Sequence, residues 1–108
     1  MQITKVNEIL VVVNDILGGK IGSIKASRKL IRLFNDIGSD SDIDLLVFKA
    51  LDSETDHLPV GKLRENYSSK RLKEIDEEIK KYEDFYRDSI MNASKNILEK
   101  YSIEMDVE

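Results

Sequence analysis

The sequence contains no cysteine and no tryptophan, and only one histidine and one proline among 108 residues. The absence of cysteine excludes disulfides, a thiolate nucleophile and cysteine-held zinc. A single histidine excludes a histidine-rich metal site as well. Five glycines and one proline are too few turn-forming residues for a sandwich or barrel of many short strands. We therefore expect a helical domain with no bound metal and no cofactor.

The chain also lacks a long apolar run and an excess of positive charge. The longest apolar run, residues 9–13, is far shorter than the roughly 18 residues that a membrane span needs, and no signal-peptide cleavage site follows it. The 17 basic and 21 acidic residues give a net charge of −4, whereas nucleic-acid binding depends on many Lys and Arg contacts to phosphate. We therefore expect a cytoplasmic protein that binds neither membrane nor nucleic acid. Its natural charged partner is a basic protein.

Apolar residues recur at helical spacing in the segments 3–17, 21–37 and 42–51 and in a long segment that begins at Ser68 or Ser69. Gly18, Gly19 and Gly38 follow the first two segments and are expected to end those helices. Residues 9–13 are rich in β-branched side chains and could instead form a buried strand. In the third helix we expect five residues to face inward: Ile43, Leu46, Val47, Ala50 and Leu51. The sequence thus predicts an all-α fold, a single domain over residues 1–108 that forms a bundle of four to five helices.

The last helix is the longest predicted element. Its apolar positions lie three or four residues apart for about 30 residues: Leu72, Ile75, Ile79, Tyr82, Tyr86, Ile90, Ala93 and Ile97. At ~1.5 Å per residue, such a helix is about 45 Å long, whereas a domain of this size has a radius of gyration of about 13 Å. We therefore expect the helix either to bend near residues 88–89 or to overhang the bundle.

Acidic residues are concentrated in the middle of the chain. Residues 36–56 include seven acids and one base, Lys49, and the flanking segments 20–32 and 62–73 are basic. One interpretation is that these charged faces neutralise each other when the helices pack. The other is that the acidic stretch contacts a partner, with an exposed aromatic side chain as an anchor. The predicted contact residues are Asp40, Asp42, Asp44, Asp52, Glu54, Asp56 and Tyr67.

The acidic stretch contains two incomplete metal-binding patterns. Residues 40–44 begin like a calcium loop, but Leu45 and Leu51 replace the glycine and glutamate that such a loop requires. Glu54 and His57 form one Glu-x-x-His pair, and a di-iron bundle needs two. A mononuclear site formed by Asp52, Glu54, Asp56 and His57, or a role for His57 as a general acid or base, remains an alternative.

A structural role for this turn is the favoured interpretation. His57 is expected to form a hydrogen bond with a carboxylate or a main-chain carbonyl, and Pro59 and Gly61 to fix the path of the chain after it. Arg64 is expected to pair with Glu54 or Asp56 across the turn.

Residues 51–61, LDSETDHLPVG, followed by Arg64, resemble the hallmark I-D-S-E-T-D-H-L-P-x-G-x-x-R of an uncharacterised bacterial domain family. Upstream, residues 26–30 look like the Ala-Arg-x-Leu helix of that family, and downstream Leu72, Asp76, Glu78 and Glu83 are similar to its charged C-terminal helix. The resemblance implies a small helical domain without an assigned reaction.

These observations favour an immunity protein of the kind found in contact-dependent growth inhibition, which binds and neutralises a cognate bacterial toxin. The toxin is expected to be a nuclease, because carboxylates can imitate phosphate and occlude a basic active site. The alternative is a helical adaptor or regulator that uses the loop of residues 53–64 for recognition. A metal-assisted enzyme centred on His57 is the third hypothesis. We expect a protein that is not an enzyme, and its oligomeric state does not follow from the sequence.

Overall fold

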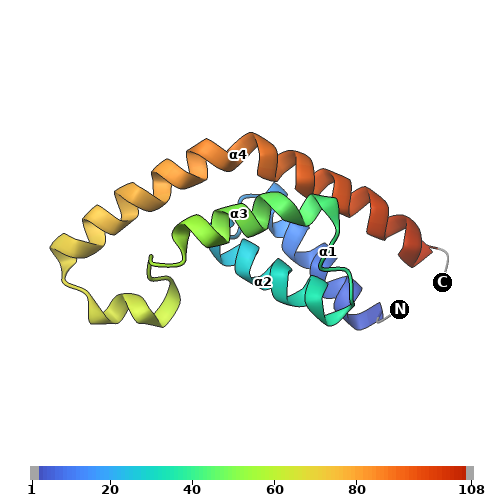
Figure 1. Ribbon diagram of the computed structural model, residues 1–108, viewed down its shortest axis with the longest axis horizontal. Helices are drawn as coiled ribbons and strands as arrows, with labels where there is room; N and C mark the ends of the chain where they lie inside the picture. Colours follow the sequence, from blue (N-terminus) through green and yellow to red (C-terminus); the bar gives the residue numbers. More distant parts are fainter. Residues whose placement is uncertain (1–2, 107–108) are drawn as a thin grey trace.

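The computed structural model describes the backbone of residues 3–106 and the side chains of residues 3–102. It contains four α-helices, α1 (Ile3–Leu17), α2 (Ser23–Asp36), α3 (Leu46–Thr55) and α4 (Ser69–Asp106), and two short 3₁₀ helices, η1 (Ile43–Leu45) and η2 (Gly61–Asn66) (Figure 1). Within residues 3–106 there is no strand. The predicted all-α bundle with a long C-terminal helix is confirmed, and residues 9–13 are helical.

Glycines end the first two helices as predicted. Gly19 and Gly38 have positive φ angles of 70° and 72°, a conformation that glycine adopts at low cost. In both cases the next amide donates to the carbonyl five residues back: Lys20 to Asp15 at 2.8 Å, and Ser39 to Phe34 at 2.9 Å. This pattern is the Schellman motif. It turns the chain sharply, so that α2 can pack back against α1.

The start of α2 is capped from a distant part of the chain. Gly22 precedes the helix and has no side chain with which to cap it. Instead, the carboxylate of Glu83 on α4 accepts a hydrogen bond from the amide of Ser23 at 2.9 Å. A negative charge at a helix N-terminus is favourable because of the helix dipole. This contact fixes the middle of α4 against the start of α2.

The core lies where α1 packs against both α2 and α4, and where α3 closes the gap between α2 and α4. Phe34 is fully buried and meets the ring of Tyr101 edge-on, with the ring centroids 5.5 Å apart. The largest fully buried side chains of this core are Val6, Ile9, Val13, Ile24, Leu30, Phe34, Leu45, Phe48, Leu51, Ile90 and Ile97.

The predicted inner face of the third helix is partly wrong. Ile43 and Leu46 are exposed, whereas Leu45 and Phe48 are buried together with Leu51. The segment 43–51 is apolar on almost every side, so periodicity alone does not identify its buried face. The structure buries Phe48, which is the bulkiest apolar side chain of this segment and gains the most from burial.

Helix α4 both curves and overhangs. Figure 1 shows it as a continuous arch over the other three α-helices, with its first turns and η2 extending beyond them. Ser68 caps its start, because the amide of Arg71 donates to the Ser68 hydroxyl at 3.2 Å. Leu58 and Ile75 are buried at this extended end. The molecule is therefore elongated and measures 51 × 25 × 23 Å.

The hydroxyl of Ser94 is a buried polar group of α4 that has no hydrogen-bond partner among the described residues. Burying such a hydroxyl costs ~1–3 kcal/mol, and alanine is also the better helix former. Ser94→Ala is therefore expected to raise the free energy of unfolding by about 1 kcal/mol in a urea titration. Ser27→Ala is the matched control, because Ser27 is equally buried but donates to the Ser23 carbonyl at 2.8 Å. A destabilised Ser94→Ala variant would contradict this account.

Candidate protein-binding face

Polar contacts connect the segment of residues 42–64 to α4 along most of its length. The partners run antiparallel, because each step forward from residue 42 meets a residue further back on α4. The contacts join Asp42 to Lys100, Asp44 to Asn96, Glu54 to Tyr86, His57 to Glu78, and Arg64 to Asp76. Several of the predicted partner-binding acids therefore hold α3 in register with α4.

Asp42 is the most buried carboxylate of the predicted set, with a side chain that is 10% exposed. Its oxygens accept hydrogen bonds from Lys100 at 2.8 Å, from the Tyr101 hydroxyl at 3.0 Å and from the amide of Asp44 at 2.9 Å. Asp44 also contacts Lys100, at 3.0 Å. Burial raises the pKa of Asp42, but the hydrogen bonds from Lys100, Asp44 and Tyr101 outweigh it, so that the pKa is lowered overall. Asp42 is thus ionised, and its carboxylate oxygens are engaged in hydrogen bonds within the chain.

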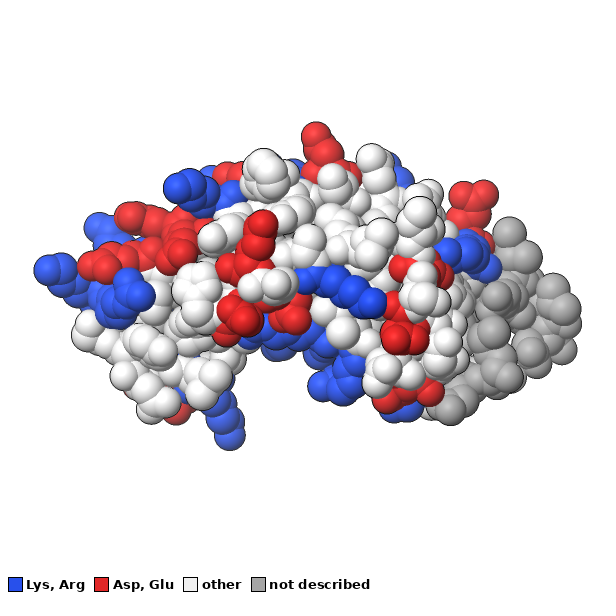
Figure 2. All heavy atoms as spheres, viewed as in Figure 1, with Lys and Arg blue, Asp and Glu red and all other residues white. Residues whose placement is uncertain are grey.

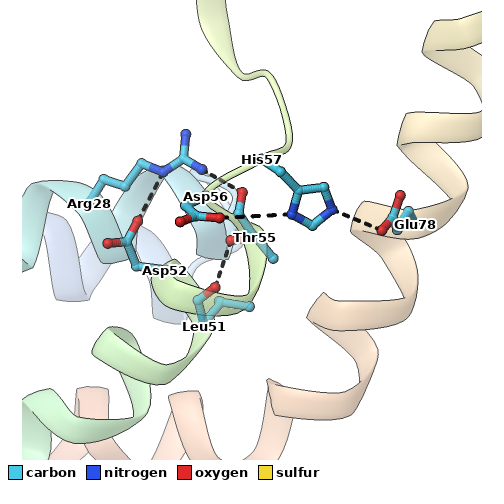
Figure 3. Close-up of polar contacts among 7 residues, drawn as sticks. All are labelled: Arg28, Leu51, Asp52, Thr55, Asp56, His57 and Glu78. Atoms are coloured by element: carbon cyan, nitrogen blue, oxygen red, sulfur yellow. Dashed lines mark hydrogen bonds and ion pairs between the residues drawn. The ribbon is translucent and has the colours of Figure 1, made fainter.

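Asp52 is paired with a basic residue of α2. The guanidinium of Arg28 donates to Asp52 at 3.1 Å and to the carbonyl of Thr55 at 2.8 Å, and the Thr55 hydroxyl donates to the Leu51 carbonyl (Figure 3). This one ion pair joins the basic face of α2 to the acidic stretch, which is the kind of contact that the first interpretation of the charge pattern predicted.

His57 links the turn after α3 to α4. Its Nε2 lies 3.1 Å from a carboxylate oxygen of Glu78, and its Nδ1 lies 3.9 Å from Asp56 (Figure 3). The predicted hydrogen bond between His57 and a carboxylate is therefore present, with a partner 21 residues further along the chain.

The predicted pairing of Arg64 with Glu54 or Asp56 is wrong. Arg64 instead contacts Asp76 of α4 at 2.7 Å. The buried Pro59 and the positive φ angle of 64° at Gly61 direct the chain into η2. This short helix carries Arg64 toward the start of α4 and away from the acids of α3.

Four of the predicted contact residues remain open to solvent: Asp40, Glu54, Asp56 and Tyr67. Tyr67 lies at the extended end, directly after η2. The role of these residues as partner contacts stays a prediction.

Three exposed apolar side chains of η1, α3 and α4 are not among the predicted contact residues. Phe85 is 78% exposed, Ile43 75% and Leu46 59%. The pattern of α4 indicates that Phe85 is exposed. Tyr82 and Tyr86 lie in the apolar stripe that faces the bundle, and Phe85 lies outside that stripe. Ile43 and Leu46 carry no such clue, because apolar residues lie on almost every side of their segment.

An uncharged band of surface joins these apolar residues. On α4, Phe85, Ser89, Asn92 and Asn96 are exposed and recur at three- and four-residue intervals, which places them on one face. Asn96 donates a hydrogen bond to Asp44 at 3.1 Å, so this face of α4 lies next to the residues that begin α3. Figure 2 shows mostly uncharged surface between α4 at the upper edge and α3 below it. We call this band, together with Glu54 at its end, the α3–α4 face, defined by residues Ile43, Leu46, Ala50, Glu54, Phe85, Ser89, Asn92 and Asn96.

The end of the α3–α4 face is hollowed into a groove of about 440 Å³, lined by Glu54, Glu78, Lys81, Tyr82 and Phe85. The hydroxyl of Tyr86 donates to Glu54 at 2.8 Å, and this hydrogen bond to a carboxylate raises the pKa of Tyr86. The rings of Phe85 and Tyr86 meet edge-on, with centroids 5.0 Å apart. The groove therefore combines acidic and aromatic walls whose side chains are held by neighbours.

The side chains proposed for a mononuclear metal site point to different partners. Asp52 turns to Arg28, Glu54 to Tyr86 and His57 to Glu78. Among the described side chains there is no group of three or more histidine and carboxylate residues that could hold a metal ion.

Comparisons with family models, curated proteins and solved structures gave no match to this chain. The family resemblance of residues 51–64 therefore stays a prediction. None of the helices in residues 3–106 combines the length and apolar character needed to cross a bilayer.

Proposed function

We propose that this chain is an immunity protein, a non-catalytic binding protein that neutralises a basic protein toxin through its α3–α4 face. The observation that carries this proposal is the exposure of Phe85 and Ile43. They are the two most exposed large apolar side chains that the structure describes. Large apolar side chains on one surface mark interaction sites when polar groups surround them.

The charge around this face indicates the class of partner. Glu54 and Asp56 are exposed at the end of α3, and Asp40 lies before η1, near Ile43. These exposed carboxylates can meet cationic groups of a partner, whereas Asp42, Asp44 and Asp52 are held internally. Opposite fields on two proteins accelerate their association and disfavour acidic partners. A nuclease toxin, whose active site is basic because it binds phosphate, has the complementary charge.

The dimensions of the molecule also fit such an interface. A stable complex buries roughly 800 Å² per partner, and the α3–α4 face lies along a molecule 51 Å long. Apolar anchors in the centre and charges at the edge are the usual arrangement in tight complexes. The uncharged band between Ile43 and Phe85, with carboxylates at its ends, has this arrangement.

The proposal is tested by expressing the chain together with the products of its neighbouring genes. We expect one of these products to stop bacterial growth when expressed alone, and co-expression of this chain to restore growth. The purified proteins are expected to form a complex with a nanomolar Kd that weakens as salt is added. The absence of a toxic neighbour, or a toxic neighbour against which the chain gives no protection, would refute the proposal.

A further inference from the structure

The groove at the end of the α3–α4 face has the chemistry of a receptor for a single cationic side chain. The phenyl ring of Phe85 is mostly exposed, and the half-buried ring of Tyr82 lies in the same lining. Glu54 and Glu78 provide the two carboxylates. A cation can therefore meet an aromatic face and a negative charge in the same place, which strengthens both interactions.

Both carboxylates retain the capacity to accept more hydrogen bonds. A carboxylate has about four acceptor positions on its two oxygens. Glu54 accepts one hydrogen bond, from Tyr86, and Glu78 has one contact, with His57. These internal contacts hold the carboxylates in place and leave their remaining lone pairs available, so a ligand meets a site that is already ordered.

The groove also contains a cation of its own. Lys81 lines it, and within residues 3–102 its ammonium group has no ion pair. Two carboxylates and one lysine leave one net negative charge in the lining. An incoming cation is attracted by that charge but repelled by Lys81, so the loss of Lys81 has an effect of opposite sign to the loss of Glu54.

We propose that this groove receives an arginine side chain of the protein partner, with the guanidinium stacked on Phe85 and paired with Glu54 and Glu78. Arginine fits better than lysine because its guanidinium is planar, stacks on aromatic rings and can donate two parallel hydrogen bonds to a carboxylate. The inference rests on the proposed function for the identity of the partner, but the groove itself can be tested without that partner.

The test uses the full chain and the capped tripeptide Gly-Arg-Gly, followed by NMR at low salt. We expect chemical-shift changes confined to Glu54, Glu78, Tyr82 and Phe85 and their neighbours, with a Kd on the order of 1 mM. Gly-citrulline-Gly, which has the same shape without the charge, is expected not to bind. Gly-Lys-Gly is expected to bind at least 3-fold more weakly.

Variants separate the groove from general attraction to an acidic protein. Phe85→Leu and Glu54→Gln are each expected to weaken Gly-Arg-Gly binding about 5–10-fold, and Lys81→Gln to tighten it about 3-fold. Asp88→Asn is the matched control, because Asp88 is an exposed acid of α4 outside the groove lining and should leave the Kd unchanged. Thermal unfolding of each variant verifies that the fold is intact.

Three results would overturn the inference: equal binding of the lysine and arginine peptides, tighter binding of spermidine than of Gly-Arg-Gly, or shift changes that persist in both Phe85→Leu and Glu54→Gln. If these variants lose the peptide but still protect fully against a toxin, the inference is wrong and the immunity function stands. If the peptide binds as described but no neighbouring gene product is toxic, the groove stands and the immunity function fails.

Discussion

Asp42→Ala is expected to lower the free energy of unfolding by about 2–4 kcal/mol, because the mostly buried carboxylate of Asp42 both caps η1 and joins it to α4. The carboxylate receives hydrogen bonds from Lys100, from Tyr101 and from the amide of Asp44. A hydrogen bond to a charged group contributes roughly 1.5–3 kcal/mol, and a lost helix cap costs about 1 kcal/mol. Its removal also leaves the buried hydroxyl of Tyr101 without this acceptor.

Urea unfolding followed by circular dichroism measures this loss. Asp40→Ala is the matched control, because Asp40 is an exposed acid two residues away whose contact with Lys49 uses the main-chain carbonyl and survives the substitution. Asp40→Ala is expected to change stability by less than about 0.5 kcal/mol. Equal effects of the two substitutions would show that the internal role assigned to Asp42 is wrong.

The effect of Asp42 also depends on pH in a defined direction. Its pKa in the folded protein lies below the ordinary value of 3.8, because the hydrogen bonds from Lys100, Asp44 and Tyr101 outweigh the opposing effect of burial. A group with a lowered folded pKa stabilises the fold above its unfolded pKa, and this contribution is lost as the pH falls through the folded value. The stability difference between the wild type and Asp42→Ala should therefore be full at pH 6 and shrink below about pH 4.

The pairing of Lys100 with Asp42 and Asp44 predicts a corresponding loss of folding stability at high pH. Burial lowers the pKa of Lys100, but hydrogen bonds to Asp42 and Asp44 outweigh it and raise the pKa above the ordinary 10.5. A raised folded pKa gives a stabilisation that is present below the unfolded pKa and lost as the pH rises through the folded one. The contacts among Asp42, Asp44 and Lys100 therefore stabilise the fold at pH values between the folded pKa of Asp42 and that of Lys100.

Features that depend on neighbours in the chain were predictable from the sequence. The bounds of α1, the glycine stops at Gly19 and Gly38 and the cap at Ser68 all follow from local backbone chemistry. The long stripe of α4 was predictable for the same reason, because its spacing repeats for many turns. The register of α4 against the other helices was not, since it depends on contacts between residues 12 to 60 positions apart.

The role of the acidic stretch shows where sequence reasoning ends. Charge counts cannot distinguish an acid that meets a partner from one that meets a distant lysine of the same chain. Asp42 and Glu54 look alike in sequence, yet Asp42 is almost fully buried against Lys100 and Glu54 is exposed. The two roles are distinguished only by the antiparallel packing of the segment 42–64 on α4. This packing buries Asp42 and leaves Glu54 accessible at the groove beside Phe85.

The double substitution Ile43→Asp and Leu46→Asp is expected to weaken toxin binding at least 100-fold, or by about 3 kcal/mol, without unfolding the protein. Both side chains are exposed, so their replacement removes no core contact. In the proposed complex they lie in the apolar centre of the interface, where an unpaired charge is strongly unfavourable. The new negative charges also lie on the face that attracts a basic partner, so an effect of charge alone would strengthen binding.

Loss of apolar anchors and gain of negative charge are expected to change the affinity in opposite directions, so this double substitution distinguishes the two explanations. If the toxin is held only by long-range attraction between opposite charges, the double variant should bind as well as the wild type or better. If the apolar side chains are anchors, binding and protection should both be lost. Val11→Asp is the matched control, because Val11 is 58% exposed, almost the same as Leu46 at 59%, but lies on α1. Loss of binding in Val11→Asp, with Ile43→Asp and Leu46→Asp unaffected, would move the interface from α3 to α1.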